Sequence, residues 1–416
     1  MKSWSDVYLP PIDSRFVFPM LSLHNSASNS AVTLPNKAEY SMYVCGITPY
    51  DATHLGHAAT YITFDLVNRY LTAMGKRVNF VENVTDIDDP LLERAHRDGV
   101  DWEDLAHSQI DLFRGDMADL HVIPPQSYIG AVEAIPLIID SIQSLQEADT
   151  VYPVDGDLYF SVNSDEKFGS RSHLSQEKMV EIFSERGGDP KRVGKKQPLD
   201  ALVWQLQRPG EPAWPSPFGA GRPGWHIECC AIALAYLPLN DSSEFMIDIQ
   251  GGGSDLLFPH HEMGAAQSRI LGKRDYARIY MYAGMIGLDG EKMSKSKGNL
   301  LFVSRMIMQG CDPMAIRLAL LSDRYAEDRM WQVELLTQAN DLLARLRLLL
   351  SRPEVAPTDP VIQKMINALS DNLDTPSVFR ALEEWCSATE MVTTGDELGS
   401  PGELARALDL LLGIAV

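Results

Sequence analysis

The chain has 416 residues, of which 45% are hydrophobic and 22% charged, and its formal net charge is −21. This is an ordinary globular composition with room for two or three domains, which excludes a disordered or fibrous protein. Affinity for nucleic acid comes largely from Lys and Arg, so the acidic balance makes a nucleic-acid partner less expected.

Two further features of the sequence bear on where the protein works. No run approaches the roughly 18 apolar residues of a membrane span, and the N-terminus lacks the apolar segment of a signal peptide. The cysteines are few and odd in number, which argues against a disulfide framework; they are Cys45, Cys229, Cys230, Cys311 and Cys386. We therefore expect a cytoplasmic protein with no membrane partner.

Residues 1–38 predict an irregular N-terminal extension, and the segment that follows is the centre of the prediction. An apolar strand ending at Val44 stops at Gly46 and Pro49, and a helical pattern opens near Leu55. Cys45 lies where the strand ends, and His54 and His57 lie where the helix begins. Backbone N–H groups and the dipole at a helix N-terminus favour phosphate. The alternative is that the two histidines only cap the helix and that Cys45 is a small core residue.

The first half of an α/β domain is predicted over residues 39–119. Its second strand, from Arg77 to Glu82, leads into polar residues that begin at Asn83. Ligands bind at the carboxyl ends of parallel strands in open sheets, so these residues are candidates for a binding site. An inserted region is expected over 120–204. It contains the segment 185–190, Glu-Arg-Gly-Gly-Asp-Pro, which could be either a functional motif or simply an exposed turn.

The second half of the domain is predicted over 205–309, and a helical C-terminal domain over 310–416. The second half contains Trp225, Cys229 and His260, and a glycine-flanked loop with the sequence Lys-Met-Ser-Lys-Ser at 292–296. Cysteine thiolates and imidazole form a zinc ligand set. On spacing alone, Cys45, Cys229 and His260 are weak evidence for a metal site, because buried cysteines that only pack in the core are common.

The pair formed by His-x-Gly-His at 54–57 and Lys-Met-Ser-Lys-Ser at 292–296 resembles the paired motifs of class I aminoacyl-tRNA synthetase catalytic domains. The resemblance implies a Rossmann-like parallel sheet that binds ATP with Mg²⁺. His54, His57, Lys292 and Lys295 would then act on the phosphates, and the lysines would neutralise charge on the departing pyrophosphate. Met293, Ser294 and Ser296 would contact the nucleotide in the same loop.

The segments around Cys45, Cys229 and His260 resemble cysteinyl-tRNA synthetase, whose zinc binds the thiolate of substrate cysteine. The resemblance implies one zinc ion per chain on these three residues. Where the synthetases have a glutamate ligand, this chain has Gly264, so either a ligand is lost or the substrate thiolate completes the site. A cysteinyl-adenylate site is implied at Cys45, Gly46, Ile47, Thr48, Thr60, Asn83, Val84, Thr85, Trp225, Gly253, Ser254, Asp255 and Ile286.

Four features separate the chain from the tRNA enzymes: the loop 47–53, the turn 185–190, Gly264, and a short tail. The tail, 311–416, has 9 Lys and Arg against 17 Asp and Glu, whereas a surface that grips an anticodon stem would be basic. In all four the chain resembles the ligases of mycothiol biosynthesis. The resemblance implies ATP-dependent joining of L-cysteine to the amine of glucosaminyl-inositol, with release of pyrophosphate and AMP. We expect a monomer that uses small-molecule substrates and no nucleic acid. The alternatives are a truncated cysteinyl-tRNA synthetase and a non-catalytic zinc-binding relative.

Overall fold

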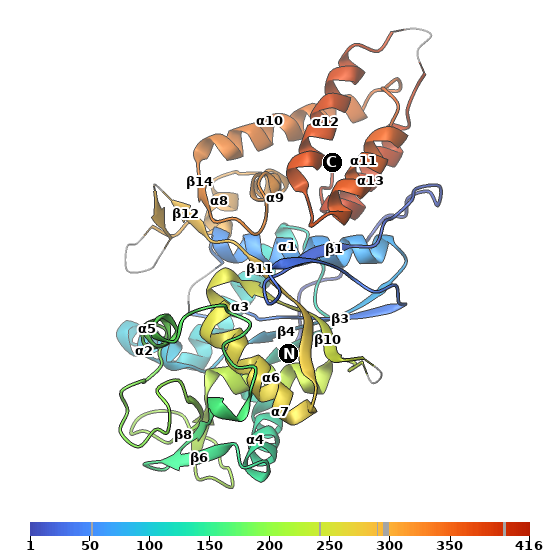
Figure 1. The fold of residues 1–416 in the computed structure, drawn as a ribbon. Coiled ribbons are helices and arrows are strands. Elements are labelled where there is room, and N and C mark those ends of the chain that lie inside the picture. Colours follow the sequence, from blue (N-terminus) through green and yellow to red (C-terminus); the bar gives the residue numbers. More distant parts are fainter. Residues whose placement is uncertain (51–52, 241–242, 289, 294–298, 394–396) are drawn as a thin grey trace.

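The computed structural model describes residues 1–50, 53–240, 243–288, 290–293, 299–393 and 397–416. Its centre is a five-stranded parallel sheet in the order β11-β10-β3-β4-β5 (Figure 1). The strands are β3 (Glu39–Val44), β4 (Arg77–Val84), β5 (Ser127–Gly130), β10 (Phe245–Gly253) and β11 (Asp275–Ala283). The predicted Rossmann-like fold is confirmed.

Helices cover both faces of this sheet. The face toward the C-terminal helices carries α1 (Leu55–Ala73), and the other face carries α4 (Ala131–Glu147), α6 (Trp225–Tyr236) and α7 (Glu262–Gly272). The sheet covers one side of α1 and the C-terminal helices the other, so this helix is buried almost all round. After β4 the chain forms α2 (Asp89–Asp98) and α3 (Trp102–Asp119).

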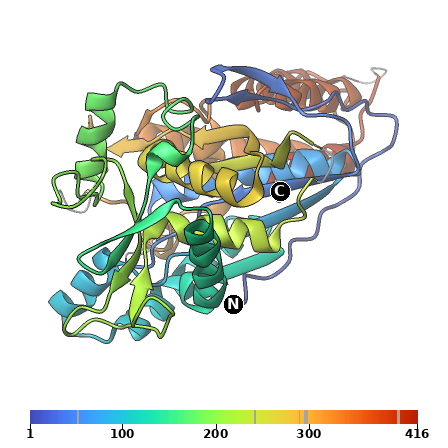
Figure 2. The same ribbon diagram turned by 60° about the horizontal axis from the view of Figure 1, so that its bottom comes forward.

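The boundary of the inserted region differs from the prediction of 120–204. The short strand β5 pairs in parallel with β4, and α4 packs against α6, so residues 127–147 belong to the central sheet domain. The part that departs from the sheet is a four-stranded antiparallel sheet with α5 (Gln176–Glu185), seen beside the parallel sheet in Figure 2. Its strands are β6 (Val151–Val154), β7 (Asp157–Phe160), β8 (Ala201–Leu206) and β9 (Gly221–Pro223).

The prediction that residues 1–38 are irregular is wrong for their second part. An antiparallel hairpin forms there from β1 (Ser22–Asn25) and β2 (Ser30–Thr33), with the polar tract as its turn. Leu23 is fully buried, and β1 lies along β11. The first residues are also attached, since the Trp4 indole donates a hydrogen bond to the Val122 carbonyl (2.7 Å).

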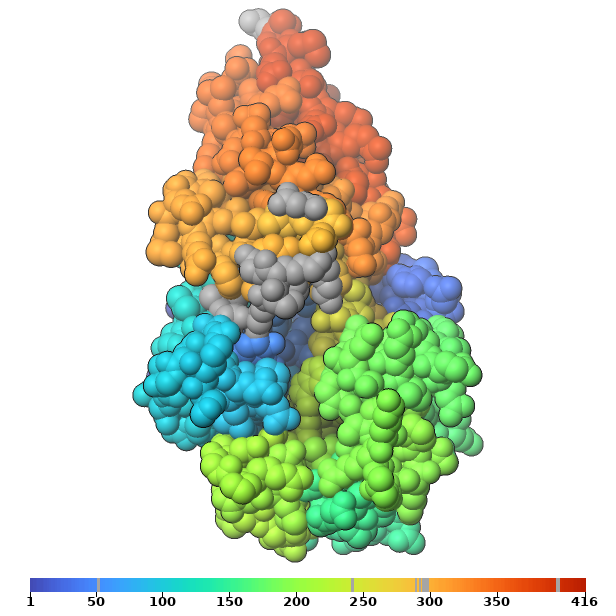
Figure 3. Space-filling model, turned by 90° about the vertical axis from the view of Figure 1, so that its left-hand side faces the viewer, coloured from blue at the N-terminus to red at the C-terminus, as the bar shows by residue number. Residues whose placement is uncertain are grey.

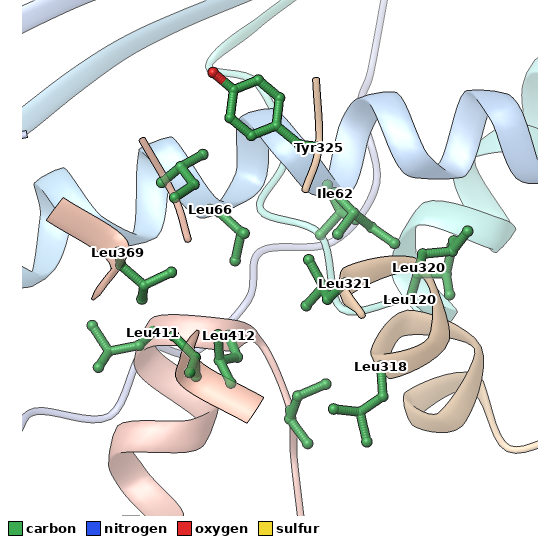
Figure 4. Packing of buried hydrophobic residues seen from close by; sticks show 14 of the residues in the cluster. Ile62, Leu66, Leu120, Leu318, Leu320, Leu321, Tyr325, Leu369, Leu411 and Leu412 are labelled. Atoms are coloured by element: carbon green, nitrogen blue, oxygen red, sulfur yellow. The ribbon is translucent and has the colours of Figure 1, made fainter. Parts of the chain in front are cut away.

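The C-terminal part is helical, as expected, and packs closely on the sheet domain. Leucines of α9 and α13 meet Ile62 and Leu66 of α1 in one hydrophobic core (Figure 4). A small sheet of β12 (Ile286–Leu288), β13 (Glu291–Lys292) and β14 (Arg329–Trp331) joins the two parts. The helices are α8 (Val303–Met308), α9 (Pro313–Leu321), α10 (Val333–Leu350), α11 (Asp359–Ser370), α12 (Thr375–Glu390) and α13 (Pro401–Leu412). Among the described helices, none has the length and apolar character needed to cross a membrane.

Candidate active site and metal centre

A cavity of about 490 Å³ opens at the carboxyl ends of the parallel strands. The chain runs from β3 to β4 and β5 in one direction and from β10 to β11 in the other, so the strand order reverses between β3 and β10. Such a reversal is where open α/β sheets bind ligands. The predicted site residues that line this cavity are Cys45, Gly46, Ile47, Thr48, His54, His57, Thr60, Trp225, Gly253, Asp255 and Met293.

The loop after β3 is held by residues that were predicted to line the site but lie behind it. The Gly46 N–H donates to Asn83 Oδ1 (2.9 Å), and the Thr85 N–H donates to the Ile47 carbonyl (3.0 Å). A Cβ on Gly46 would lie 1.5 Å from the Asn83 carbonyl oxygen, so only glycine fits there. Asn83 and Thr85 therefore position the loop.

Other predicted residues do not line the cavity. Val84 and Ile286 are buried in the hydrophobic core, and Ser254 begins a 3-10 turn after β10. The backbone of Lys292 lies in β13, paired with Gly287. Ser294, Lys295 and Ser296 lie outside the described residues. Gly56, inside the His-x-Gly-His motif, also lines the cavity. Lining residues that the sequence analysis missed are Tyr50, Tyr61, Leu256, Gly284, Met285 and Leu300.

His54 and His57 lie at the start of α1 with their rings stacked, 3.8 Å between centroids. Nδ1 of His54 accepts hydrogen bonds from the N–H groups of Gly56 (3.1 Å) and His57 (3.4 Å), so His54 caps the helix. A neutral His54 must then carry its proton on Nε2, a donor suited to phosphate oxygens. Burial lowers the pKa of His57 to about 4, which keeps it neutral at pH 7. The helix-capping alternative and the phosphate prediction are thus compatible.

Cys45, Cys229 and His260 converge beside this cavity, with their donor atoms within 4.8 Å of one another. The two Sγ atoms are 3.8 Å apart, and His260 Nε2 is 3.2 Å from Cys229 Sγ. A tetrahedral zinc with Zn–S bonds of about 2.3 Å separates two sulfur ligands by about 3.8 Å. All three residues are buried, so the donor set and its spacing fit a metal ion.

The thiols of Cys45 and Cys229 have pKa values shifted in opposite directions. Burial and the hydrogen bond to Cys229 raise the pKa of Cys45. Burial also raises that of Cys229, but the hydrogen bond from Cys45 and the nearness of His260 outweigh it and hold this pKa well below its ordinary value. Cys229 is therefore a thiolate, the form that binds metals.

His226, His261 and Tyr282 surround this group and were missed by the sequence analysis, whereas Trp225 was predicted. His261 Nε2 lies 3.1 Å from Cys45 Sγ, and its Nδ1 lies 3.0 Å from the Tyr282 hydroxyl. His226 Nδ1 lies 3.0 Å from His260 Nδ1, and the Trp225 ring stacks on His260 at 4.2 Å between centroids. The neighbouring pairs Trp225-His226 and His260-His261 were the available signal. Gly264 lies beside the group, and nothing is within 4 Å of a Cβ built there.

Comparisons with known proteins agree with this geometry. The model of the tRNA synthetases class I (C) catalytic domain matches residues 32–341. Methionyl-tRNA synthetase of Mycobacterium tuberculosis, solved with methionyl-adenylate, covers 91% of this chain and 90% of its own, with a TM-score of 0.62 and 16% identity, and it shows the shared fold.

Closer relatives match along the whole length. The L-cysteine:1D-myo-inositol 2-amino-2-deoxy-alpha-D-glucopyranoside ligase of Gordonia bronchialis is 48% identical over 421 residues and covers 100% of both chains. The ligase of the same name from Kribbella flavida is 50% identical over 419 residues, with the same coverage. The chain therefore belongs to the class I tRNA synthetase family and, within it, to the family of these ligases.

Proposed function

We propose that the chain is an ATP-dependent, AMP-forming ligase that joins L-cysteine to the amine of glucosaminyl-inositol through a cysteinyl-adenylate, a step of mycothiol biosynthesis. The observation that carries the proposal is the position of the Cys45, Cys229 and His260 group. Cys45 lines both the recess around this group and the cavity of about 490 Å³ at the strand ends, called the nucleotide cavity below. A cysteine substrate whose thiol is held at the group therefore has its carboxylate beside bound ATP. The expected identity of the acceptor comes from the names of the full-length relatives.

In the first step the cysteine carboxylate attacks the α-phosphate of ATP and pyrophosphate leaves. His54 would donate from Nε2 to phosphate oxygens at the positive end of the α1 dipole, and neutral His57 would contribute hydrogen bonding without charge. Lys292 and Lys295, with Met293, Ser294 and Ser296, would close on the nucleotide and balance charge on the pyrophosphate with Mg²⁺. Trp225 and Asp255 hold the cysteinyl moiety as an aromatic wall and a polar anchor.

The Cys45, Cys229 and His260 group fits zinc. When bound there, zinc supplies a soft site that prefers the thiolate of cysteine to the hydroxyl of serine. Cys45, Cys229 and His260 would hold the ion, and because Gly264 offers no side-chain ligand, the substrate thiolate would complete its ligand set.

In the second step the sugar amine attacks the acyl carbon and AMP leaves. The acceptor distinguishes this activity from tRNA charging. The C-terminal part, residues 311–416, has 9 Lys and Arg against 17 Asp and Glu, whereas a surface that grips an anticodon stem would be basic. We infer a cytoplasmic monomer that takes small-molecule substrates and no nucleic acid.

The experiment compares two acceptors with the same enzyme, ATP and L-cysteine. Glucosaminyl-inositol should accelerate AMP release and yield an amide, with little dependence on added salt. Deacylated tRNA should not accelerate it, even at low salt, where phosphate contacts are strongest. Charging of tRNA at a rate comparable with the sugar reaction would overturn the proposal in favour of a cysteinyl-tRNA synthetase.

A further inference from the structure

A second cavity, of about 790 Å³, adjoins the nucleotide cavity. The two share Thr48, Tyr50, Trp225, Asp255 and Leu256, so a ligand in one is next to a ligand in the other. The face of the molecule in Figure 3 is hollowed here, between the segment of α2 in cyan and the inserted region in green. Apart from these shared residues, the lining of the second cavity has no role in cysteine activation or in the phosphate contacts proposed above.

The turn 185–190, whose role the sequence left open, forms one wall of this second cavity. The Arg186 guanidinium donates hydrogen bonds to the backbone carbonyls of Asp255 and Phe258, which fixes the turn to the segment that lines the adenylate site. A Cβ on Gly188 would lie 2.5 Å from the Phe183 ring, so the turn packs too closely for a side chain. These contacts hold the turn in a fixed position along one side of the second cavity.

The second cavity is lined by more acidic than basic side chains. Its lining includes carboxylates from α2 and from the turn, and two of its three arginines form ion pairs, while Arg186 donates to backbone carbonyls. Arg222 forms ion pairs with Asp89 and Glu211, and Arg192 forms one with Asp157 (2.8 Å). The carboxylate of Glu185 has no partner among the described residues. Such a wall attracts a cation and repels a polyanion.

Glu228 gives independent evidence for a polar ligand in this cavity. Its side chain lines the second cavity from α6, is only 1% exposed, and leaves Oε2 without a hydrogen-bond partner among the residues described. A buried polar atom without a partner is costly, and a bound hydroxyl or ammonium group would satisfy it.

We propose that this cavity binds the acceptor, a polyhydroxylated primary amine in its ammonium form, and that Asp88 takes the proton this amine must lose before it attacks. The proposal rests on the proposed function and names where the second substrate binds. Asp88 lies between the two cavities: it lines the second, and the Thr48 that interacts with its carboxylate lines both.

The ammonium group gives one proton to the Asp88 carboxylate and becomes a neutral amine. The nitrogen lone pair forms the C–N bond to the acyl carbon, and the electron pair of the C–O bond leaves with the phosphate oxygen of AMP. The second proton leaves the nitrogen as the tetrahedral intermediate collapses and passes to the departing phosphate. The products are the amide and AMP.

The surroundings of Asp88 suit this role. Its Oδ1 accepts the Leu91 N–H (3.0 Å) as the N-cap of α2. Burial, with a smaller contribution from Asp89, raises its pKa to about 7, although Leu91, Thr48 and Arg222 oppose the shift. A base with a pKa near the working pH is an efficient proton acceptor.

The charged groups that face Asp88 come from three elements. Asp89 follows it at the start of α2, Arg222 approaches from β9, and Glu228 from α6. Asp86, two residues earlier, adds a carboxylate near Glu228. Asp89 raises the proton affinity of Asp88 and Arg222 lowers it, whereas burial raises the pKa of Glu228 well above its usual range and so favours the neutral form of that group.

The test uses the full-length enzyme with zinc and follows two readouts. Cysteine-dependent exchange of pyrophosphate into ATP reports adenylate formation and needs no acceptor, and AMP release with glucosaminyl-inositol reports the second step. Asp88→Asn keeps the helix cap, because Asn is as good an N-cap as Asp. It should preserve the exchange and lower acceptor-dependent AMP release by roughly 100-fold, with loss of the rise in rate near pH 7.

Glu185→Gln tests binding separately. It should raise the KM for the aminosugar about fivefold with exchange unchanged. The matched control is Glu181→Gln, one turn earlier on α5, where the carboxylate pairs with Lys178 outside the cavity. An unchanged acceptor KM in Glu185→Gln together with unchanged AMP release in Asp88→Asn would overturn this assignment while leaving the ligase activity established. A wild-type enzyme that forms no amide with the aminosugar would instead overturn the proposed function.

Discussion

Cys229 illustrates at the scale of one residue how burial and neighbours decide chemistry. A buried thiol is ordinarily inert, because desolvation disfavours the thiolate. Here Cys45 donates a hydrogen bond to Cys229 and His260 lies 3.2 Å away, so the charge persists in the interior. Cys230, the next residue, points to Ser268 (3.0 Å), and burial raises its pKa to about 12. Adjacent cysteines therefore have different roles.

Substitution of Cys229 tests the metal group. Cys229→Ser replaces a soft thiolate by a hydroxyl that does not ionise near pH 7, so we expect zinc content to fall from about one per chain to near zero. Metal analysis and cysteine-dependent pyrophosphate exchange should fall together. Cys311→Ser, in a half-buried cysteine outside the group, should change neither. Full zinc and activity in Cys229→Ser would refute the assignment.

His57 gives a pH-dependent prediction. Its pKa in the folded protein is about 4, whereas that of an unfolded histidine is about 6.5. Between these values the unfolded chain binds more protons, so the contribution of His57 to stability is complete above about pH 6.5 and is lost as the pH falls toward 4. Between pH 7 and pH 5 the wild type should lose about 1 kcal/mol more unfolding free energy than His57→Gln, because partial exposure reduces the full effect. Urea unfolding at both pH values measures this. Equal losses in the two proteins would contradict it.

The site residues that could be predicted from the sequence are those that lie at the ends of strands or the starts of helices. Cys45, His54 and Cys229 each stand at or near the end of a strand or the start of a helix, and the fold brings them to one edge of the sheet. Gln250 and Tyr282 escaped prediction because they lie inside β10 and β11, where a polar side chain gives no boundary signal. Their contacts with His261 exist only after the sheet has formed.

At the scale of elements, length decided which predictions succeeded. The strand–loop–helix that ends at Ala73 has strong periodicity and was predicted from it. β5 has four residues and follows two prolines, so its place in the sheet depends on pairing with β4 and not on any local pattern. The hairpin within 22–33 was missed for the same reason, because β1 alternates over only four positions and β2 has no buried residue to give a pattern.

Gly46 provides a prediction at the scale of its element. Gly46→Ala would place a Cβ 1.5 Å from the Asn83 carbonyl oxygen, so the loop after β3 must move away from β4. We expect a loss of at least about 2 kcal/mol in unfolding free energy together with impaired adenylate formation. Chemical denaturation and pyrophosphate exchange measure the two effects.

Gly264→Ala is the matched control for Gly46→Ala. Nothing lies within 4 Å of a Cβ at Gly264, and the residue is in the first turn of α7, so Ala should stabilise the protein by at most about 1 kcal/mol. Zinc content should remain about one per chain. Equal damage from the two substitutions would show that crowding at Asn83 is not the cause.

At the scale of the whole molecule, the helical C-terminal part and the sheet domain share a core. Residues of α1, α9, α11 and α13 belong to one hydrophobic cluster (Figure 4). Within it Asp65 of α1 is buried and pairs with Arg69 (2.6 Å) and with Arg317 of α9. Arg317 Nε also donates to the Leu412 carbonyl (2.6 Å), and so connects the sheet domain to the end of the chain. The predicted boundary near residue 310 therefore divides the sequence without dividing the core.

Asp65→Asn tests whether these parts unfold together. Burial raises the pKa of Asp65, but Arg69 and Arg317 outweigh it, so the carboxylate is charged at neutral pH. Its loss leaves two buried guanidinium groups without their counter-charge, which should cost about 3–5 kcal/mol. Glu390→Gln, which breaks the exposed pair with Arg345, is the control and should change stability little. In Asp65→Asn, circular dichroism and pyrophosphate exchange should lose their signals at the same lowered temperature, because one core unfolds as a unit. Loss of helical signal well before loss of exchange would show instead that the C-terminal helices unfold independently of the active site.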